Sequence, residues 1–141
     1  MLSVTSEYAL RALACLAESE STKMLGHNLA RRSHVPNNYL SKIMIVLRNA
    51  GIVEASRGVA GGYSLRRLPR EIRILHVVEL FENDTMRSGC LLDRKLNCSD
   101  QAPCMAHAAW REARQTCLHF LESTTLADIT TARSRAAPVQ T

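Results

Sequence analysis

Apolar residues recur at helical spacing along the first part of the chain. Residues 3–18 place Ala12 and Leu16 on one face with polar residues opposite, which predicts an amphipathic helix. A short second helix is predicted over residues 26–33, and a third over about 37–49. The buried stripe of the third helix is predicted to consist of Leu40, Ile43 (or Met44) and Leu47. These three segments are expected to form the start of one small helical domain.

Turn residues mark the ends of these helices. Pro36 stands at the start of the third helix, and Gly51 lies just past its end, where a left-handed residue commonly terminates a helix. Two helices joined by a tight turn, the second polar on one face, are typical of a helix-turn-helix. Many plain helical hairpins share this pattern, so the segment that follows is needed to choose between them.

That segment predicts a β-hairpin. Residues 52–56 and 63–65 are short strand patterns, and the glycine-rich stretch 57–62 between them forms the tip. A plain surface hairpin would look the same. Arg57 beside Gly58 at the tip favours a wing that contacts DNA instead.

The second half of the chain consists of a helix, a loop and a long helix. Pro69 breaks the chain, and residues 70–82 then predict a helix. Residues 83–103 are polar and have no period, which indicates a loop. Residues 104–123 predict a long helix, after which a capped last turn reaches Ile129.

The long helix has a wide apolar face. Its stripe consists of Trp110, Ala113, Cys117 and Leu121, flanked by Met105, Ala109 and Phe120. A solitary long helix with such a face needs a partner, and the simplest one is a second copy of the chain. The pattern therefore predicts a homodimer.

Together these elements predict a mainly α fold with a small β-hairpin wing. A winged helix-turn-helix DNA-binding domain is expected over residues 1–82, a cysteine loop over 83–103, and a dimerisation helix with its last turn over 104–130. Residues 131–141 contain Arg, Ser, Ala and Pro without a pattern and are expected to form a disordered tail.

Charge is unevenly divided along the chain. The formal net charge is +5, to which residues 1–70 contribute +6 and residues 71–141 contribute −1. A basic first half suits a polyanionic partner such as double-stranded DNA. A solvated surface on a basic protein would show the same balance, so charge supports the DNA-binding interpretation without deciding it.

The start of the chain bears on its location. Its first residues, Met-Leu-Ser-Val-Thr-Ser-Glu, lack the basic and apolar regions of a signal peptide, and no apolar stretch has the length of a membrane span. We expect a cytoplasmic protein without a membrane partner. Disulfides are uncommon in that compartment, so the five cysteines are expected to be free thiols or metal ligands.

Three cysteines and a histidine (Cys90, Cys98, Cys104 and His107) lie within 18 residues of one another. Soft ligands on a polar loop that runs into a helix indicate a metal site. Residues 104 and 107 are one turn apart, and a helix start after Pro103 is expected to favour an anionic Cys104 thiolate. Zinc and an iron–sulfur cluster fit this spacing almost equally, and a bare thiol switch is a third interpretation.

Polar side chains at the start of the third helix are candidates for base contacts. They are Asn37, Asn38, Tyr39, Ser41 and Lys42. Asparagine can pair with adenine, and lysine with guanine or phosphate. Arg31 and Arg32, at the end of the preceding helix, are expected to contact phosphate and so position the protein, as is Arg57 on the wing.

Four stretches of the sequence carry a resemblance to a known family. They read Val35-Pro-Asn-Asn-Tyr-Leu-Ser-Lys-Ile43, Leu47-Arg-Asn-Ala-Gly-Ile-Val53, Ser56-Arg-Gly-Val-Ala-Gly-Gly-Tyr-Ser-Leu65 and Cys104-Met-Ala-His-Ala-Ala-Trp110. These stretches resemble the Rrf2 family of bacterial winged-helix transcription regulators, over roughly residues 1–130. The last stretch is most similar to IscR-like members, which regulate iron–sulfur cluster assembly. The nitric-oxide-sensing NsrR-like members are next.

The resemblance implies a homodimer that crosses its long helices and binds a palindromic operator. It also implies an iron–sulfur cluster held by the thiolates of Cys90, Cys98 and Cys104. His107 matches the histidine ligand of IscR-like members, whereas Glu7 of the other subunit matches the acidic fourth ligand of NsrR-like members. The Cys90–Cys98 spacing is longer than in either group, so both a 2Fe-2S and a 4Fe-4S cluster are consistent with the sequence.

The sequence therefore predicts a cluster-sensing, DNA-binding transcription regulator whose operator binding depends on cluster state, with repression as the favoured sense. No nucleophile–base pair or phosphate-binding loop in the sequence indicates an enzyme. A zinc- or thiol-based redox-sensing regulator is the main alternative. An iron–sulfur electron-transfer protein is a weaker one, because such a carrier needs neither a basic wing nor a recognition helix.

Overall fold

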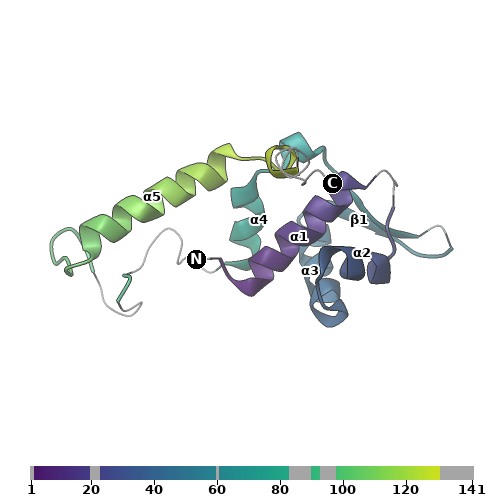
Figure 1. The fold of residues 1–141 in the computed structure, drawn as a ribbon, viewed down its shortest axis with the longest axis horizontal. Helices are drawn as coiled ribbons and strands as arrows, with labels where there is room; N and C mark the ends of the chain where they lie inside the picture. The colour runs from purple at the N-terminus through teal and green to yellow at the C-terminus, as the bar shows by residue number, and fades with distance from the viewer. Residues whose placement is uncertain (1, 20–22, 60, 83–89, 93–97, 131–141) are drawn as a thin grey trace, which may run out of the picture.

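The computed structural model describes residues 2–19, 23–59, 61–82, 90–92 and 98–130. The elements follow in the order α1 (Val4–Glu18), α2 (Gly26–Ser33), α3 (Asn37–Asn49), β1 (Val53–Ser56), β2 (Gly62–Leu65), the short 3₁₀ helix η1 (Pro69–Glu71), α4 (Ile74–Phe81) and α5 (His107–Ser123). The predicted mainly α fold with one small hairpin is confirmed (Figure 1). The predicted tail and most of the predicted cysteine loop lie outside the described residues. Among the described helices, none combines the length and apolar character that crossing a membrane requires.

Helix α1 lies at the centre of the helical domain. Its N-terminus is capped by Ser3, whose side-chain oxygen accepts a hydrogen bond from the Ser6 N–H at 3.2 Å. Its inner face carries Ala12 and Leu13, both fully buried. Helices α2, α3 and α4 all pack against it, so α1 connects the helix-turn-helix to the second half of the chain.

The turn of the helix-turn-helix is tight, as the sequence predicts. Helix α2 ends at Ser33, and the next residue, His34, caps it in the left-handed conformation with φ of 56°. The Val35 N–H donates to the Ala30 carbonyl at 3.0 Å and closes the turn. The Pro36 carbonyl then accepts from the Leu40 N–H at 2.9 Å, which starts α3.

The hairpin pairs β1 with β2 in antiparallel register, with Ser56 opposite Gly62. The sequence did not predict that β2 has a second neighbour. Tyr63 exchanges two backbone hydrogen bonds with Met24, at 2.8 and 2.9 Å. Gly62 is needed at this contact because its φ is +141° and a Cβ there would lie 2.6 Å from the Met24 carbonyl oxygen.

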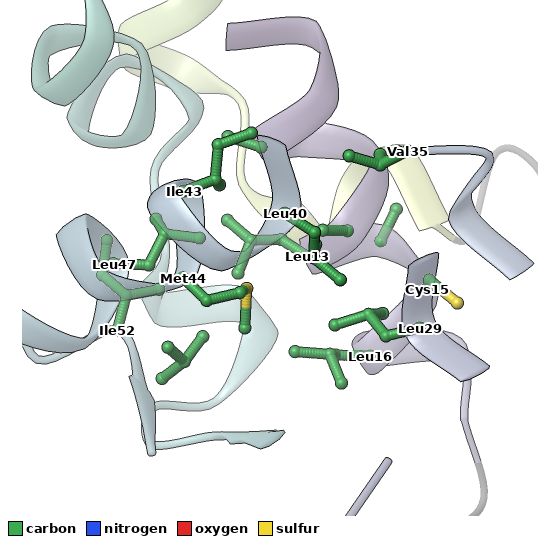
Figure 2. Packing of buried hydrophobic residues seen from close by; sticks show 14 of the residues in the cluster. Leu13, Cys15, Leu16, Leu29, Val35, Leu40, Ile43, Met44, Leu47 and Ile52 are labelled. Carbon is green, nitrogen blue, oxygen red and sulfur yellow. The ribbon is translucent and has the colours of Figure 1, made fainter. Parts of the chain in front are cut away.

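The helices and the hairpin enclose a main hydrophobic core (Figure 2). A smaller second cluster lies between α4 and α5 and consists of Ile74, Leu75, Val78 and Leu121. The largest fully buried side chains of the main core include Leu13, Leu29, Leu47 and Ile52, contributed by α1, α2, α3 and the segment before β1. Burying each such side chain stabilises the fold by about 1.5–3 kcal/mol. The apolar stripe that the sequence predicts for the third helix therefore does face the main core.

The predicted helix over residues 70–82 is wrong in its first part. The chain forms η1, then runs extended through Ile72 and Arg73, and α4 begins only at Ile74. The reason is a tertiary contact with the segment that follows α5. The Leu126 N–H donates to the Ile72 carbonyl at 2.8 Å, and the Ile74 N–H donates to the Thr124 carbonyl at 3.0 Å. These pairs use backbone groups that a continuous helix would have paired internally.

The predicted start of the long helix is also wrong. Helix α5 begins at His107 rather than at Cys104, which lies in the turn before it. That turn is closed by a hydrogen bond from the His107 N–H to the Cys104 carbonyl at 3.1 Å. The predicted last turn is confirmed, because residues 126–130 are helical and Thr125 and Asp128 cap one another.

Helix α5 projects away from the rest of the molecule, at the end opposite the hairpin (Figure 1). We term the described residues 90–92 and 98–123 the arm, and α1–α4 with the hairpin and residues 124–130 the body. Leu121 is the one buried residue of α5. Ala113 is exposed, Cys117 is half-buried, and Phe120 is 55 % exposed. The apolar face predicted from the sequence is thus left uncovered along most of the arm by the described part of this chain.

Candidate metal centre and DNA-binding surface

The sulfur atoms of Cys90, Cys98 and Cys104 converge beside the start of α5. All three lie within 4.8 Å of one another, and the Cys90 and Cys104 Sγ atoms are 3.5 Å apart. Cys90 is buried, and the other two are half-buried. Within the described residues, this is the group of potential ligand atoms close enough to hold one metal centre.

The ring of His107 lies next to this group, against its Cys98 member. Its Nδ1 atom lies 3.1 Å from the Cys98 Sγ, and its side chain is only 14 % exposed. The backbone fixes the same corner, because the Cys104 N–H donates to the Cys98 Sγ at 3.2 Å. The four candidate ligands singled out in the sequence are therefore adjacent in the structure.

Sequence reasoning missed two charged residues behind the histidine. The His107 Nε2 lies 2.9 Å from the Asp100 Oδ1, and Arg111 donates to the same carboxylate oxygen. The hydrogen bond from His107, followed by the positive charge of Arg111, lowers the pKa of Asp100 below its ordinary value. Arg111 could have been noticed because residues four apart share a helix face. Asp100 lies in an aperiodic segment, which gives no such signal.

A compact turn holds Asp100 near the histidine. The N–H and carbonyl groups of Ser99 and Ala102 pair with one another, and the Ser99 hydroxyl accepts a further bond from the Ala102 N–H at 3.2 Å. The turn sits directly between Cys98 and Cys104. It therefore sets both the position of the carboxylate and the approach of the two sulfur atoms.

The expectation of an anionic Cys104 thiolate is wrong for the metal-free thiols. The Ala106 N–H by itself lowers the pKa of Cys104, but contacts with Cys90, desolvation and Cys98 outweigh it and raise that pKa above the ordinary value. The helix starts too late in the sequence for its dipole to act fully on residue 104. Crowded thiols of this kind suit a cation, because a bound metal displaces their protons and removes the mutual repulsion of thiolates.

The remaining cysteines and the alternative fourth ligand lie elsewhere. Cys15 is buried in the core of the body, as expected, and Cys117 is half-buried on the arm. Glu7 is exposed on α1, where its carboxylate is 4.0 Å from the Arg11 guanidinium. It does not join the cysteine group within this chain, so a ligand role for Glu7 would have to act across subunits.

The candidate DNA-contacting residues are all exposed. Asn37, Asn38, Tyr39, Ser41 and Lys42 occupy the first turns of α3, Arg31 and Arg32 the last turn of α2, and Arg57 the hairpin tip. Tyr39 also packs edge-on against Tyr8 of α1, with ring centroids 5.6 Å apart. Its ring therefore has a structural contact in addition to any role at DNA.

Comparison with known proteins identifies the family. The model of the Rrf2 family, described as iron-dependent transcriptional regulators, matches residues 2–132. The chain belongs to the Rrf2 family. Rrf2 proteins are transcription regulators with a DNA-binding winged helix, which the fold of this chain reproduces.

Individual Rrf2 relatives agree with this assignment. The IscR regulator of Cereibacter sphaeroides is 30 % identical over 142 residues, covering 97 % of this chain and 91 % of the relative. The structure of T. potens IscR superimposes with a TM-score of 0.77 at 26 % identity, covering 100 % of this chain and 93 % of that one. CymR, the global cysteine regulator of B. subtilis, also gives 0.77, at 25 % identity, covering 94 % and 97 %.

Proposed function

We propose that this Rrf2 regulator senses its signal through an iron–sulfur cluster held by Cys90, Cys98, Cys104 and His107, and that operator binding depends on the state of the cluster. The observation that carries this proposal is the convergence of three sulfur atoms within 4.8 Å, with the imidazole Nδ1 3.1 Å from one of them. The regulator would act in the cytoplasm, as a repressor.

The donor set supports this choice of group. Cysteine thiolates hold iron–sulfur clusters, and replacing thiolate by histidine raises the reduction potential. A cluster bound here would supply a centre that gains or loses an electron, or is destroyed by small oxidants. Cys98 and Cys104 are half-buried rather than enclosed, so such oxidants could reach the ligands. The match to a family of iron-dependent regulators, and relatives named IscR, point the same way.

The structure suggests how the site communicates with DNA. The ligands lie at the far end of the arm, and α5 is anchored to the body where Arg73 donates to the Glu122 carbonyl at 2.6 Å. We infer that two chains pair through their arms and present two α3 helices and two wings to a palindromic operator. A cluster bound at the ligand turn would fix the start of each α5 helix. It would then set the distance between the two DNA-binding domains of the dimer.

The central experiment compares the two cluster states on DNA. The full chain is purified without oxygen, its iron and sulfide are counted, and absorption and Mössbauer spectra define the cluster type. Operator binding is then measured by fluorescence anisotropy before and after the cluster is removed. A change in operator affinity with no change on unrelated DNA is expected. Absence of iron and sulfide, or equal affinity in both states, would refute the proposal.

The fourth ligand is tested by comparing His107→Ala with Glu7→Ala. We expect His107→Ala to shift the cluster spectra and shorten cluster lifetime, because its ring already faces the Cys98 sulfur. Glu7→Ala is expected to leave both unchanged. The opposite result would assign the ligand to Glu7 of the partner subunit and place the cluster between subunits, as in NsrR-like members.

One observation favours a second candidate function. The Cys90 and Cys104 Sγ atoms are only 3.5 Å apart, and a disulfide brings two sulfur atoms to about 2.05 Å. A small approach would therefore join them, with two protons and two electrons passing to an oxidant such as a peroxide. A thiol switch of this kind predicts that metal-free protein changes its operator affinity on oxidation, and that Cys90→Ala abolishes the change.

A further inference from the structure

A line of contacts leads from solvent to the Cys98 sulfur through three side chains of the arm. Arg111 contacts the Asp100 carboxylate, Asp100 lies 2.9 Å from the His107 Nε2, and the His107 Nδ1 lies 3.1 Å from the Cys98 Sγ. The two ring nitrogens of His107 therefore have different partners. This difference has a consequence for which nitrogen carries the proton.

A carboxylate only accepts hydrogen bonds, so the contact with Asp100 requires a proton on Nε2. In a neutral imidazole the other nitrogen then has a free lone pair, and here that nitrogen is Nδ1. The lone pair points towards the sulfur group, where a metal would lie. The neighbour on one side of the ring thus selects the atom that can bind on the other side.

We propose that Asp100 is a positioning residue, which holds His107 in the tautomer and orientation that offer Nδ1 as the ligand atom, and that Arg111 fixes the Asp100 carboxylate. This inference rests on the proposed ligand role of His107. Metal-bound histidines commonly donate their other N–H to a carboxylate, and loss of that partner weakens metal binding about 10–100-fold.

The geometry also separates this role from simple stabilisation. The side chains of Asp100 and Arg111 are 71 % and 47 % exposed, and an exposed ion pair contributes little to stability. His107 is only 14 % exposed, so the carboxylate reaches a ring that is otherwise screened from solvent. Removing Asp100 should therefore change the tautomer of His107 without unfolding the arm.

The experiment compares Asp100→Ala with Glu112→Ala, which removes another exposed carboxylate from the arm. The first readout is nitrogen NMR of the metal-free full chain labelled at histidine, with the His107 signals assigned from their loss in His107→Ala. We expect the Nε2–H tautomer in the wild type and in Glu112→Ala, and a mixture of tautomers in Asp100→Ala. Asp100→Asn, which keeps an acceptor oxygen, should restore most of the Nε2–H form.

The second readout is the lifetime of the reconstituted cluster in air. Asp100→Ala should shorten it about 10-fold or more, and Glu112→Ala should not change it. An unchanged tautomer, or an unchanged lifetime, in Asp100→Ala would overturn the positioning role.

His107→Ala in the same series distinguishes this inference from the proposed function. If His107→Ala alters the cluster and Asp100→Ala does not, only the positioning role is wrong. If His107→Ala leaves the cluster unaltered, the histidine is not a ligand and the positioning role is overturned with it.

Discussion

The body and the arm of this protein are stabilised by different means. In the body, side chains from α1, α2, α3 and α4 bury one another, and many of them are fully inaccessible. In the arm, Leu121 is the one buried residue of α5, and the turn before the helix is held by polar contacts around Cys98 and His107. The body is packed within a single chain, whereas the apolar face of α5 is left uncovered along most of its length by the described part of this chain.

This difference assigns separate tasks to the two regions. A packed core keeps the DNA-reading surface in one shape, because interiors of native density resist small displacements. A region with few buried contacts opens and rearranges at low free-energy cost. Sensing is expected where the structure is most easily altered, which is the arm.

The largest expected effect comes from the cysteines of the arm. Replacing Cys90, Cys98 or Cys104 singly by alanine should abolish the cluster, because each supplies one of three converging sulfur atoms. Iron and sulfide are counted after anaerobic purification, and circular dichroism checks that the helices of the body persist. Cys117→Ala is the matched control. A single variant that keeps a full cluster with unchanged spectra would show that its residue is not a ligand.

The next largest effect is expected on dimerisation, which we propose takes place through α5 of the arm. Ala113→Glu introduces a charge into the exposed apolar face of α5, and burying that charge should weaken a dimer at least about tenfold, or 1.4 kcal/mol. Gln115→Glu adds the same charge to another exposed position of the helix and should have a small effect. Sedimentation at micromolar concentration measures both. A monomeric wild type would remove the dimer from the proposal.

The core of the body should respond to truncation much more strongly than the arm. Leu47 is fully buried, so Leu47→Ala should lower the free energy of unfolding by about 2–5 kcal/mol. Phe120 is 55 % exposed, and Phe120→Ala should change the unfolding of the body by less than about 0.5 kcal/mol. Urea denaturation of both variants tests this, and equal destabilisation would contradict the division into body and arm.

The wing should affect DNA binding without affecting the cluster. Arg57 is exposed at the hairpin tip, and Arg57→Ala should weaken operator binding and reduce the salt slope by about 1. If the arginine enters a narrow minor groove, preference for A·T flanks should also fall. Arg70→Ala, which removes an exposed arginine from η1, is the control.

The two half-sites of an operator bound by a dimer should lie roughly 34 Å, or a multiple of it, apart.

The smallest effect concerns the junction where α4 leads towards the cysteines. The Glu82 carboxylate accepts hydrogen bonds from the Ser3 N–H at 2.7 Å and the Ser6 hydroxyl at 2.6 Å. Burial by itself raises the pKa of Glu82, but the bonds from Ser6 and Ser3 outweigh it and lower that pKa below its ordinary value.

A lowered folded-state pKa contributes stability above the unfolded pKa, near 4.3, and this contribution is lost as pH falls through the folded pKa. Glu82→Gln should therefore be less stable than the wild type above about pH 5, and the difference should shrink at lower pH. Glu54→Gln, an exposed position on β1, is the control. A difference that is constant across this range would exclude the linkage.

Local sequence signals predicted the helices of the body well. The apolar spacing around Leu40, Ile43 and Leu47 corresponds to buried positions of α3, because a 3.6-residue period reports which side of a helix faces a core. The same spacing predicted a helix over 70–82 that is interrupted at Ile72 and Arg73. Nothing local could show this, because the interruption comes from pairing with Thr124 and Leu126, some fifty residues further along the chain.

By itself, the sequence determined the element types, the basic first half and the four candidate ligands, because spacing, charge and donor chemistry are properties of residues close together in the chain. Only the tertiary structure decided that the three sulfur atoms converge, that Cys104 lies outside α5, and that Asp100 and Arg111 stand behind His107. Those facts depend on how an aperiodic turn folds back on a helix, and an aperiodic segment has no repeating pattern from which that path can be read.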